Sequence, residues 1–384
     1  MKKEAQRPHQ ALRGLVMKIA QVSPLFESVP PKAYGGTERV VSYLTEELVG
    51  MGCDVTLFAS ADSVTRARLV PATGASLRAR GQGAAALACH TIQLGMLASM
   101  ARSFDVIHFH TDYLQFPMAR GLATAHVSTL HGRLDLPELA PLYRQFIDMP
   151  VVSISNSQRA PLPWINWQGT VYHGLPQDLY DFNPRPANTL LFLGRISPEK
   201  RPDRAIEIAV RSGMPLTIAA KVDPADGDYF NARIAPLLRH PLVHFIGEVG
   251  EAEKRRLLGS ARALLMPIDW PEPFGLVMIE AFACGTPVIA YRHGSVPEIV
   301  TDGVTGFIVD NQDQAVRAVA RLAGLDRQRC RQAFMQRFTA RHMAQAYLRL
   351  YEAVRERACR KRAAHPARPA GAVRAAAMHQ EHHG

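Results

Sequence analysis

Short runs rich in β-branched residues alternate along this chain with segments whose apolar residues recur at positions i, i+3 and i+4. The helical segments are residues 37–49, 202–210, 251–258 and 276–283. The runs that predict strands are residues 17–23, 54–59, 105–110, 126–131 and 151–156 in the first half, and residues 189–194, 216–220, 243–247, 263–267, 287–291 and 306–309 in the second. Such alternation predicts βαβ units and parallel sheets that are buried on both faces.

The alternation pauses over residues 174–188, where Pro176, Pro184 and Pro186 favour a linker. The linker divides the chain into two halves of similar size. The fold class is therefore α/β, with two Rossmann-like, doubly wound domains that face a central cleft. A helical pattern over residues 334–354 is long enough to cross back to the first domain. The predicted parts are a flexible extension (1–16), an N-terminal domain (17–183), a C-terminal domain (184–335), a bridging helix (336–356) and a disordered basic tail (357–384).

A net charge of +11 on 384 residues suits a protein that binds nucleic acid, a membrane surface or anionic small molecules. Much of this charge lies at the ends. Residues 1–16 carry four basic residues and one acidic residue, and residues 357–384 carry six and one. Since the body is nearly balanced, we expect no nucleic-acid partner and only a weak peripheral contact of the ends with anionic membranes.

The composition and the cysteines indicate what type of protein this is and in which cellular compartment it lies. Hydrophobic residues make up 47% and charged residues 21%, which excludes a chain disordered throughout. The five cysteines are scattered without CxxC spacing, so neither a disulfide framework nor a zinc site is indicated. The run over residues 83–100 is too interrupted by polar residues to span a membrane, and no signal peptide is visible before Met17, a candidate for the true start. We predict a cytoplasmic protein, peripheral at most to the inner face of the membrane.

The first half places glycines and histidines after its predicted strands. The first strand leads to the loop Tyr34-Gly35-Gly36-Thr37, in which paired glycines let the backbone approach a ligand and Thr37 can cap the next helix. The fingerprints GxGxxG and GxxxxGK[ST] are absent, which argues against a dehydrogenase and a P-loop NTPase. His108 and His110 share one face of a strand and are more typical of hydrogen-bonded core histidines than of ligands. His131 follows a strand at the expected cleft, where a site is favoured.

The second half opens on a strand that ends in Gly194-Arg195 and is followed by Lys200. Arginine offers a planar fork of donors and lysine a point charge, and together they form a compact receptor for a diphosphate. A basic run usually marks a solvated face, but this one follows a buried strand. An anion site is therefore the favoured interpretation.

Residues 270–287 carry the most specific pattern. Pro271, Pro273 and Gly275 predict a loop, and a helix follows over residues 276–283, whose free N–H groups can bind a phosphate. Glu272 lies on the loop. Glu280 lies one turn into a helix that is almost entirely apolar, where a carboxylate is costly unless it is paired or hydrogen-bonded. Ribose hydroxyls are suitable donors to it.

Together these motifs resemble the family 4 retaining glycosyltransferases of GT-B architecture, over about residues 17–354. The resemblance rests on a sequential set of motifs, namely Gly35-Gly36, Gly194-Arg195 with Lys200, Glu272 and Glu280 separated by seven residues, Phe274-Gly275, Gly285-Thr286-Pro287-Val288 and Gly294-Ser295-Val296-Pro297-Glu298.

The resemblance implies roles for the charged residues. Arg195 and Lys200 would hold the diphosphate of a nucleotide sugar, Glu280 would bind the ribose hydroxyls and Glu272 would hydrogen-bond the hydroxyls of the donor sugar. One residue departs from the family pattern. Arg201 occupies a position that often holds a small residue such as glycine, and it either adds a charge near the phosphates or points to solvent.

The resemblance also implies roles for five further residues. Phe274, Gly275 and Leu276 would supply backbone contacts to the donor. His131 would lie beside the reacting sugar, and Gly36 would approach the donor or the acceptor from the N-terminal domain.

The implied reaction needs no metal and no cofactor besides the nucleotide sugar itself. Attack takes place on the face that the leaving group departs from, and the leaving phosphate helps to take the acceptor proton. Arg195, Lys200 and a helix N-terminus would stabilise the charge on the leaving diphosphate. Asp226-Gly227-Asp228 superficially matches the DxD metal motif of the other large glycosyltransferase architecture, but we expect no metal there.

The function predicted from the sequence is thus retaining transfer of a hexose from a nucleotide-diphosphate sugar, with UDP-glucose favoured and GDP-mannose next. The acceptor is a sugar, a lipid or a small metabolite. Two alternatives stay open: a nucleotide-sugar epimerase on the same fold, and a catalytically silent protein that binds sugar nucleotides.

Overall fold

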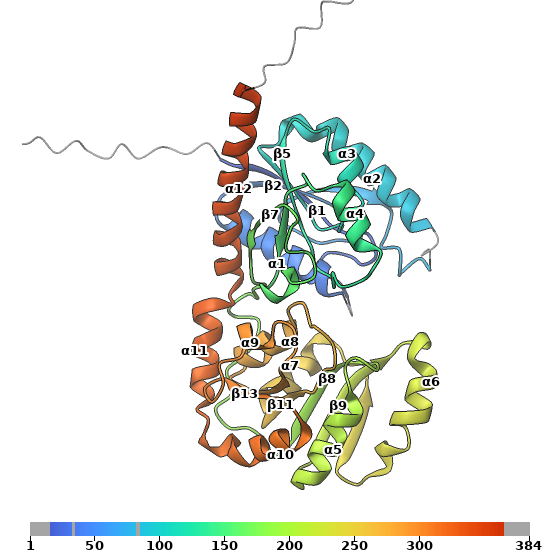
Figure 1. Ribbon diagram of the computed structural model, residues 1–384, viewed down its shortest axis with the longest axis vertical. Helices are drawn as coiled ribbons and strands as arrows, with labels where there is room; N and C mark the ends of the chain where they lie inside the picture. Colours follow the sequence, from blue (N-terminus) through green and yellow to red (C-terminus); the bar gives the residue numbers. More distant parts are fainter. Residues whose placement is uncertain (1–15, 33–34, 82–84, 365–384) are drawn as a thin grey trace, which may run out of the picture.

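The computed structural model describes residues 16–32, 35–81 and 85–364, which form two domains, each built on one parallel sheet (Figure 1). The N-terminal sheet has the order β3-β2-β1-β4-β5-β6-β7. Its strands are β1 (Lys18–Val22), β2 (Asp54–Ser60), β3 (Arg68–Thr73), β4 (Val106–Phe109), β5 (Ala125–Thr129), β6 (Val151–Ser153) and β7 (Trp167–Thr170). The C-terminal sheet has the order β10-β9-β8-β11-β12-β13. Its strands are β8 (Leu190–Ile196), β9 (Leu216–Val222), β10 (Val243–Gly247), β11 (Ala263–Met266), β12 (Val288–Tyr291) and β13 (Gly306–Val309).

Helices cover both faces of each sheet. Successive strand residues point to opposite sides, and in these strands both sides carry apolar residues that must be buried. In β1, Ile19 packs in one core cluster and Ala20 in another, and in β8 Leu190 and Leu191 divide in the same way. The helices of the N-terminal domain are α1 (Gly36–Gly50), α2 (Ala86–Met100), α3 (Phe116–Ala119) and α4 (Leu139–Gln145). Those that follow are α5 (Pro202–Ser212), α6 (Gly227–Tyr229), α7 (Glu251–Ser260), α8 (Leu276–Ala283), α9 (Val296–Ile299), α10 (Gln312–Arg321), α11 (Arg327–Arg337) and α12 (Ala340–Ala364). Two Rossmann-like domains are confirmed.

The single helix predicted over residues 334–354 is wrong, because the chain breaks between α11 and α12. The backbone N–H of Leu175 donates to the carbonyl of Phe338 at 2.9 Å, and the N–H of Ala340 donates to the carbonyl of Leu175 at 2.7 Å. The two segments that connect the domains therefore lie side by side and are hydrogen-bonded to each other. The break also allows α12 to change direction toward the N-terminal domain.

Helix α12 packs along the N-terminal domain as predicted, with Met343, Tyr347 and Tyr351 buried in the same core cluster as Ile19 of β1 (Figure 1). It continues to Ala364, so the prediction of a disordered tail is wrong over residues 357–364. The remainder of that tail and residues 1–15 of the predicted extension lie outside the described residues. Within the described ranges we find no helix with the length and apolar character needed to cross a bilayer.

Two strands and several helices of the structure, α2 among them, were missing from the sequence prediction. Strands β3 and β7 are the two edges of the N-terminal sheet, and β3 contains Pro71, which an edge strand tolerates. Helix α2 carries no Asp, Glu, Lys or Arg, so the amphipathic pattern that identifies most surface helices is absent from it.

Glu298, the last residue of the GSVPE motif, connects the domains directly. Its carboxylate accepts hydrogen bonds at 2.7 Å from the backbone N–H groups of Asn156 and Ser157, and at 2.9 Å from the hydroxyl of Tyr172. These partners belong to the N-terminal domain, whereas Glu298 lies on α9 of the C-terminal domain. The motif thus fixes how the two domains meet beside the site.

Candidate active site

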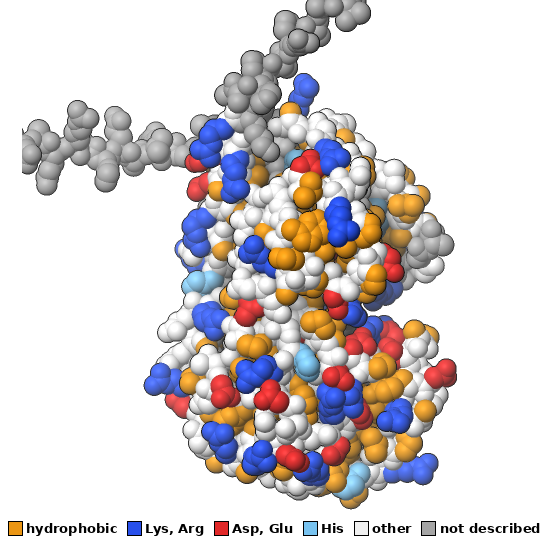
Figure 2. Space-filling view, viewed as in Figure 1, with side chains coloured by type: hydrophobic (Ala, Val, Ile, Leu, Met, Phe, Trp, Pro, Cys, Tyr) orange, Lys and Arg blue, Asp and Glu red, His pale blue; other side chains and the backbone are white. Residues whose placement is uncertain are grey.

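The candidate site lies where α1 and α8 begin, on opposite sides of the boundary between the domains. Gly36 and Leu276 approach so closely that a Cβ added to Gly36 would lie 3.8 Å from Cδ1 of Leu276. Helix α1 begins at Gly36, with Gly35 before it and no side-chain cap, so the predicted cap by Thr37 is wrong. Tyr34 of the same loop lies outside the described residues. Figure 2 shows that the surface narrows between the domains and is hollowed on one side.

Lys200 and Glu272 form an ion pair at this boundary. The Lys200 ammonium also lies 4.7 Å from the centroid of the Trp270 ring, a distance that suits a cation–π contact. Glu272 is 9% exposed, so its charge is held largely out of water. The structure therefore brings together a cation predicted to bind phosphate and a carboxylate predicted to bind sugar hydroxyls.

Arg195 is surrounded by carboxylates. Its guanidinium lies 2.5 Å from Glu199, 3.8 Å from Asp223 and 3.9 Å from Asp226. Asp226 therefore faces an arginine. Among the described residues, no group of three or more histidine, cysteine or acidic side chains is placed to hold a metal ion.

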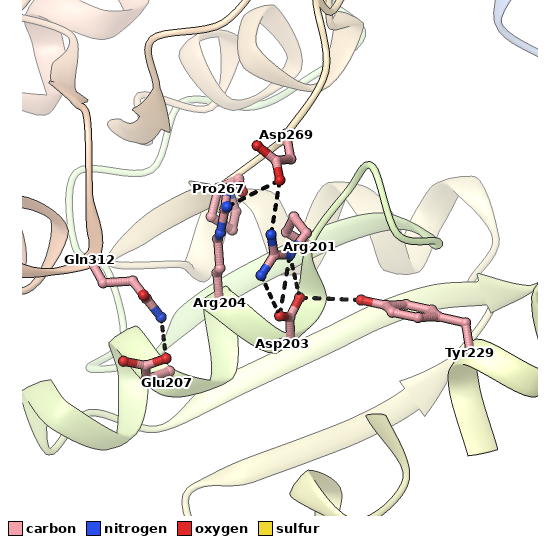
Figure 3. Close-up of polar contacts among 8 residues, drawn as sticks. All are labelled: Arg201, Asp203, Arg204, Glu207, Tyr229, Pro267, Asp269 and Gln312. Atoms are coloured by element: carbon pink, nitrogen blue, oxygen red, sulfur yellow. Dashed lines mark hydrogen bonds and ion pairs between the residues drawn. The ribbon is translucent and has the colours of Figure 1, made fainter. Parts of the chain in front are cut away.

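Of the two outcomes predicted for Arg201, a side chain that points to solvent is wrong, because carboxylates hold its guanidinium, whereas an added charge near the phosphates stays a prediction. Arg201 forms ion pairs of 2.8 Å with Asp203 and 2.9 Å with Asp269, and Arg204 also reaches Asp269, at 3.1 Å (Figure 3). The hydrogen bonds that Arg201 donates to Asp203 and Asp269 raise its pKa. Its backbone has φ of 54°, a left-handed conformation that glycine adopts with less strain. The conformation explains why glycine suits this position, and the ion pairs offset the strain that arginine brings.

The loop that carries Glu272 is held by the segment after β12. The backbone N–H of Ser295 donates to the carbonyl of Glu272 at 2.9 Å, and the Ser295 hydroxyl donates to the carbonyl of Phe274 at 2.7 Å. Phe274 itself is 2% exposed and its carbonyl is held by Ser295, so its predicted backbone contact to the donor stays a prediction. Gly275 then turns the chain into α8 with φ of 76°.

Glu280 is 5% exposed and is paired with a residue that sequence reasoning missed. Lys254 of α7 donates to its carboxylate at 2.8 Å and also lies 3.0 Å from Glu251. Glu251 in turn pairs with Arg39 of the N-terminal domain at 2.7 Å. Burial would lower the pKa of Lys254, but Glu280 and Glu251 more than offset it and raise that pKa. The carboxylate predicted to bind ribose is thus joined to the opposite domain by a chain of ion pairs.

His131 lies between the two domains and is half-buried. Its ring stacks on His173 with centroids 5.3 Å apart, and His173 meets the edge of Phe274 at 4.8 Å. Burial lowers the pKa of His131 to about 3, so the ring is neutral. His173 was missed because it follows β7, an edge strand that the sequence did not reveal. His108 and His110 are buried and hydrogen-bonded, as expected of core histidines.

Two families match most of the chain between them. Residues 34–161 match the family described as Glycosyltransferase Family 4, and residues 182–334 match Glycosyl transferases group 1.

Relatives agree with these matches. The phosphatidyl-myo-inositol mannosyltransferase of Mycolicibacterium smegmatis is 27% identical over 360 residues, which cover 85% of this chain and 89% of that protein. The D-inositol 3-phosphate glycosyltransferase of Streptomyces scabiei is 36% identical over 163 residues, but these cover only 39% of this chain and 34% of that protein.

Solved structures share the fold. AviGT4, a glycosyltransferase involved in avilamycin A biosynthesis, superposes with a TM-score of 0.68 at 26% identity, covering 88% of this chain and 98% of that one. Anabaena HepE in complex with UDP-glucose gives a TM-score of 0.65 at 18% identity, with 88% and 100% covered.

Proposed function

This chain belongs to the family 4 glycosyltransferases of GT-B fold, and on that premise we propose that it moves a hexose, with retention, from a nucleotide-diphosphate sugar to an acceptor bound by the N-terminal domain. UDP-glucose is the favoured donor and GDP-mannose the next. The observation that carries the proposal is the contact between Lys200 and Glu272 beside the start of α8. A cation for the diphosphate and a carboxylate for sugar hydroxyls stand there side by side.

Binding of the diphosphate would replace contacts within the protein. Lys200 would share its charge between Glu272 and a phosphate, and Arg195 would exchange carboxylate contacts for phosphate ones. Both cations, with the free N–H groups of α8, would stabilise the charge that gathers on the leaving diphosphate. The oxygen freed on Glu272 would accept a hydrogen bond from a hydroxyl of the donor sugar. His131 would lie beside that sugar, and Glu280 would bind the ribose while remaining near Lys254.

Two of the similar proteins bear on the choice of donor. HepE, whose fold this chain shares, was solved in complex with UDP-glucose. One relative is named a mannosyltransferase, so mannose is the second sugar to consider. We expect UDP-glucose to raise the melting temperature more than GDP-mannose or ADP-glucose at equal concentration, because a ligand that binds only the folded state stabilises it. A thermal-shift series with these three donors measures this order. A larger shift with GDP-mannose would make GDP-mannose, and not UDP-glucose, the favoured donor.

Turnover of the preferred donor separates the proposal from its alternatives. A transferase releases the nucleoside diphosphate and glycosylates an added acceptor. An epimerase would convert the donor to its epimer without an acceptor. A silent binding protein would shift in melting temperature without any turnover. The acceptor panel should include sugars, small metabolites and lipids.

Activity should persist in EDTA. Because two cationic side chains and a helix N-terminus can supply the charge stabilisation, we expect the rate with excess EDTA to match the untreated rate. Rates measured with EDTA alone and with EDTA plus excess Mn²⁺ test this. Loss of activity that Mn²⁺ restores would instead assign Asp226 and Asp228 to a metal site.

A further inference from the structure

A continuous chain of buried polar side chains runs from His131 to the C-terminal helix. Nε2 of His131 lies 2.9 Å from Nδ1 of His110, and Nε2 of His110 lies 2.8 Å from Oε1 of Gln21. The Gln21 amide then donates from Nε2 to the hydroxyl of Tyr351 on α12 at 3.1 Å. Three strand ends and a helix from the far end of the sequence thus meet in one network.

The network continues beyond Tyr351. The Tyr351 hydroxyl lies 2.7 Å from Nδ1 of His108, and Nε2 of His108 lies 2.7 Å from the hydroxyl of Thr129. The Thr129 hydroxyl lies 2.8 Å from that of Tyr347. Gln21, His108, Thr129 and both tyrosines are 0% exposed, and His110 is 1% exposed. So many polar groups buried together are tolerated only because each has a partner.

The donors and acceptors fix one direction for the chain near His131. Burial holds the pKa of His110 well below its usual value, so the ring is neutral and carries one N–H. The Gln21 carbonyl can only accept, so Nε2 of His110 donates to it. Nδ1 of His110 must then accept, and Nε2 of His131 donates. Since His131 is also neutral, its Nδ1 is left as a bare lone pair.

This Nδ1 has no hydrogen-bond partner within the described part of the chain, although the atom is almost fully buried. A buried acceptor without a donor is costly, and it is uncommon in native proteins. His131 stacks on His173, which touches Phe274 of the donor loop, so the unpartnered nitrogen lies in the region where substrate is proposed to bind.

We propose that Gln21, His110 and Tyr351 are positioning residues that hold His131 in the tautomer whose Nδ1 accepts the hydrogen of a substrate hydroxyl. The inference rests on the proposed function for the identity of the substrate, but the tautomer is a property of the protein alone. Rotation of the Gln21 amide would reverse every bond between it and His131 and would present an N–H instead. The Tyr351 hydroxyl opposes that rotation when it donates its own hydrogen to Nδ1 of His108, because it can then only accept from the amide nitrogen of Gln21. The C-terminal helix thereby contributes to the site without touching substrate.

Tyr351→Phe tests the proposal with little change in volume. We expect kcat to fall on the order of tenfold, which corresponds to the loss of about one buried hydrogen bond, while the affinity for the nucleoside diphosphate stays unchanged. The affinity should not respond because Arg195, Lys200 and Glu280 lie in the other domain. Tyr143→Phe is the matched control, since Tyr143 is a buried tyrosine of the same domain outside the network, and we expect it to keep the wild-type kcat.

A second measurement reads the tautomer directly. In ¹⁵N-histidine NMR spectra of the wild-type protein, assigned with His131→Asn, Nδ1 of His131 should have the shift of an unprotonated nitrogen and Nε2 that of a protonated one. In Tyr351→Phe and in Gln21→Leu, the two signals should move toward a mixture of tautomers. This reading remains available if no donor is turned over, so failure of the proposed function is distinguishable from failure of this inference.

Three results would overturn the inference. They are a wild-type His131 protonated at Nδ1, a wild-type kcat in folded Tyr351→Phe, and a loss of kcat with an unchanged His131 spectrum. The last would show that Tyr351 acts through the stability of the fold alone. If neither variant folds, the wild-type tautomer still decides.

Discussion

Replacing Lys200 with alanine should abolish sugar transfer while both domains remain folded. Removal of one donor that stabilises a developing anion typically lowers the rate by about 10²–10³-fold, or about 3–4 kcal/mol. The loss here should be at the upper end, because the substitution also leaves the Glu272 carboxylate without its cation. An unpaired, largely buried negative charge would then face the incoming diphosphate. Steady-state rates with a saturating donor, together with thermal melting, measure both effects.

Arg211→Ala provides the control for Lys200→Ala. Arg211 lies in the last turn of α5, at the opposite end of that helix from Lys200, and pairs with Asp313 at 2.5 Å. An exposed pair of this kind contributes little to stability, so we expect normal turnover and nearly normal melting. Near-normal turnover in Lys200→Ala itself would contradict the assignment of this residue to the phosphate.

Gly294→Ala should remove most activity, because Gly294 supports the loop that carries Glu272. An added Cβ would lie 2.3 Å from both the backbone nitrogen and the carbonyl oxygen of Glu272, and 2.6 Å from the carbonyl carbon of Pro271. Backbone atoms cannot yield as a flexible side chain can, so the loop must shift. A misplacement of about 1 Å in a site can cost about 10²-fold in rate. Turnover and the free energy of unfolding should be measured together.

Gly303→Ala separates the crowding from the backbone strain. Gly303 also has a left-handed backbone, with φ of 71° against 57° for Gly294, but no atom lies within 4 Å of its added Cβ. We expect this variant to lose only about 1–2 kcal/mol of stability and to keep its activity. Equal turnover in the two variants would mean that the position of Glu272 does not depend on Gly294.

The sequence predicted most of the fold because parallel strands bury both faces and therefore appear as apolar runs. Helix α8 was predicted with the bounds that the structure shows, 276–283, since prolines precede it and Gly285 follows it. The break before α12 was not predictable, because the apolar pattern continues through Phe334, Phe338 and Met343. What ends the first helix is pairing with Leu175, a contact made far along the chain.

The motifs identified residues that lie at the boundary between the domains, but not their partners. Lys200 meets Glu272 across 72 residues, and Glu280 meets Lys254 across 26, so neither pair follows from local spacing. Lys254 lies in a run of charged residues on α7 that suggests an ordinary solvated face. Because Lys254 already compensates the burial of Glu280, that burial alone does not require ribose hydroxyls as partners. The roles of these residues toward a donor stay predictions.

A calorimetric titration of UDP and of uridine into the wild-type protein and into Lys200→Ala tests the proposed diphosphate site directly. If Arg195 and Lys200 form a diphosphate receptor, UDP will bind the wild-type protein much more tightly than uridine, and the substitution will remove most of that difference while the affinity for uridine stays the same. Equal binding of UDP to both proteins would contradict the assignment of Lys200 to the diphosphate, because the diphosphate would then be held elsewhere.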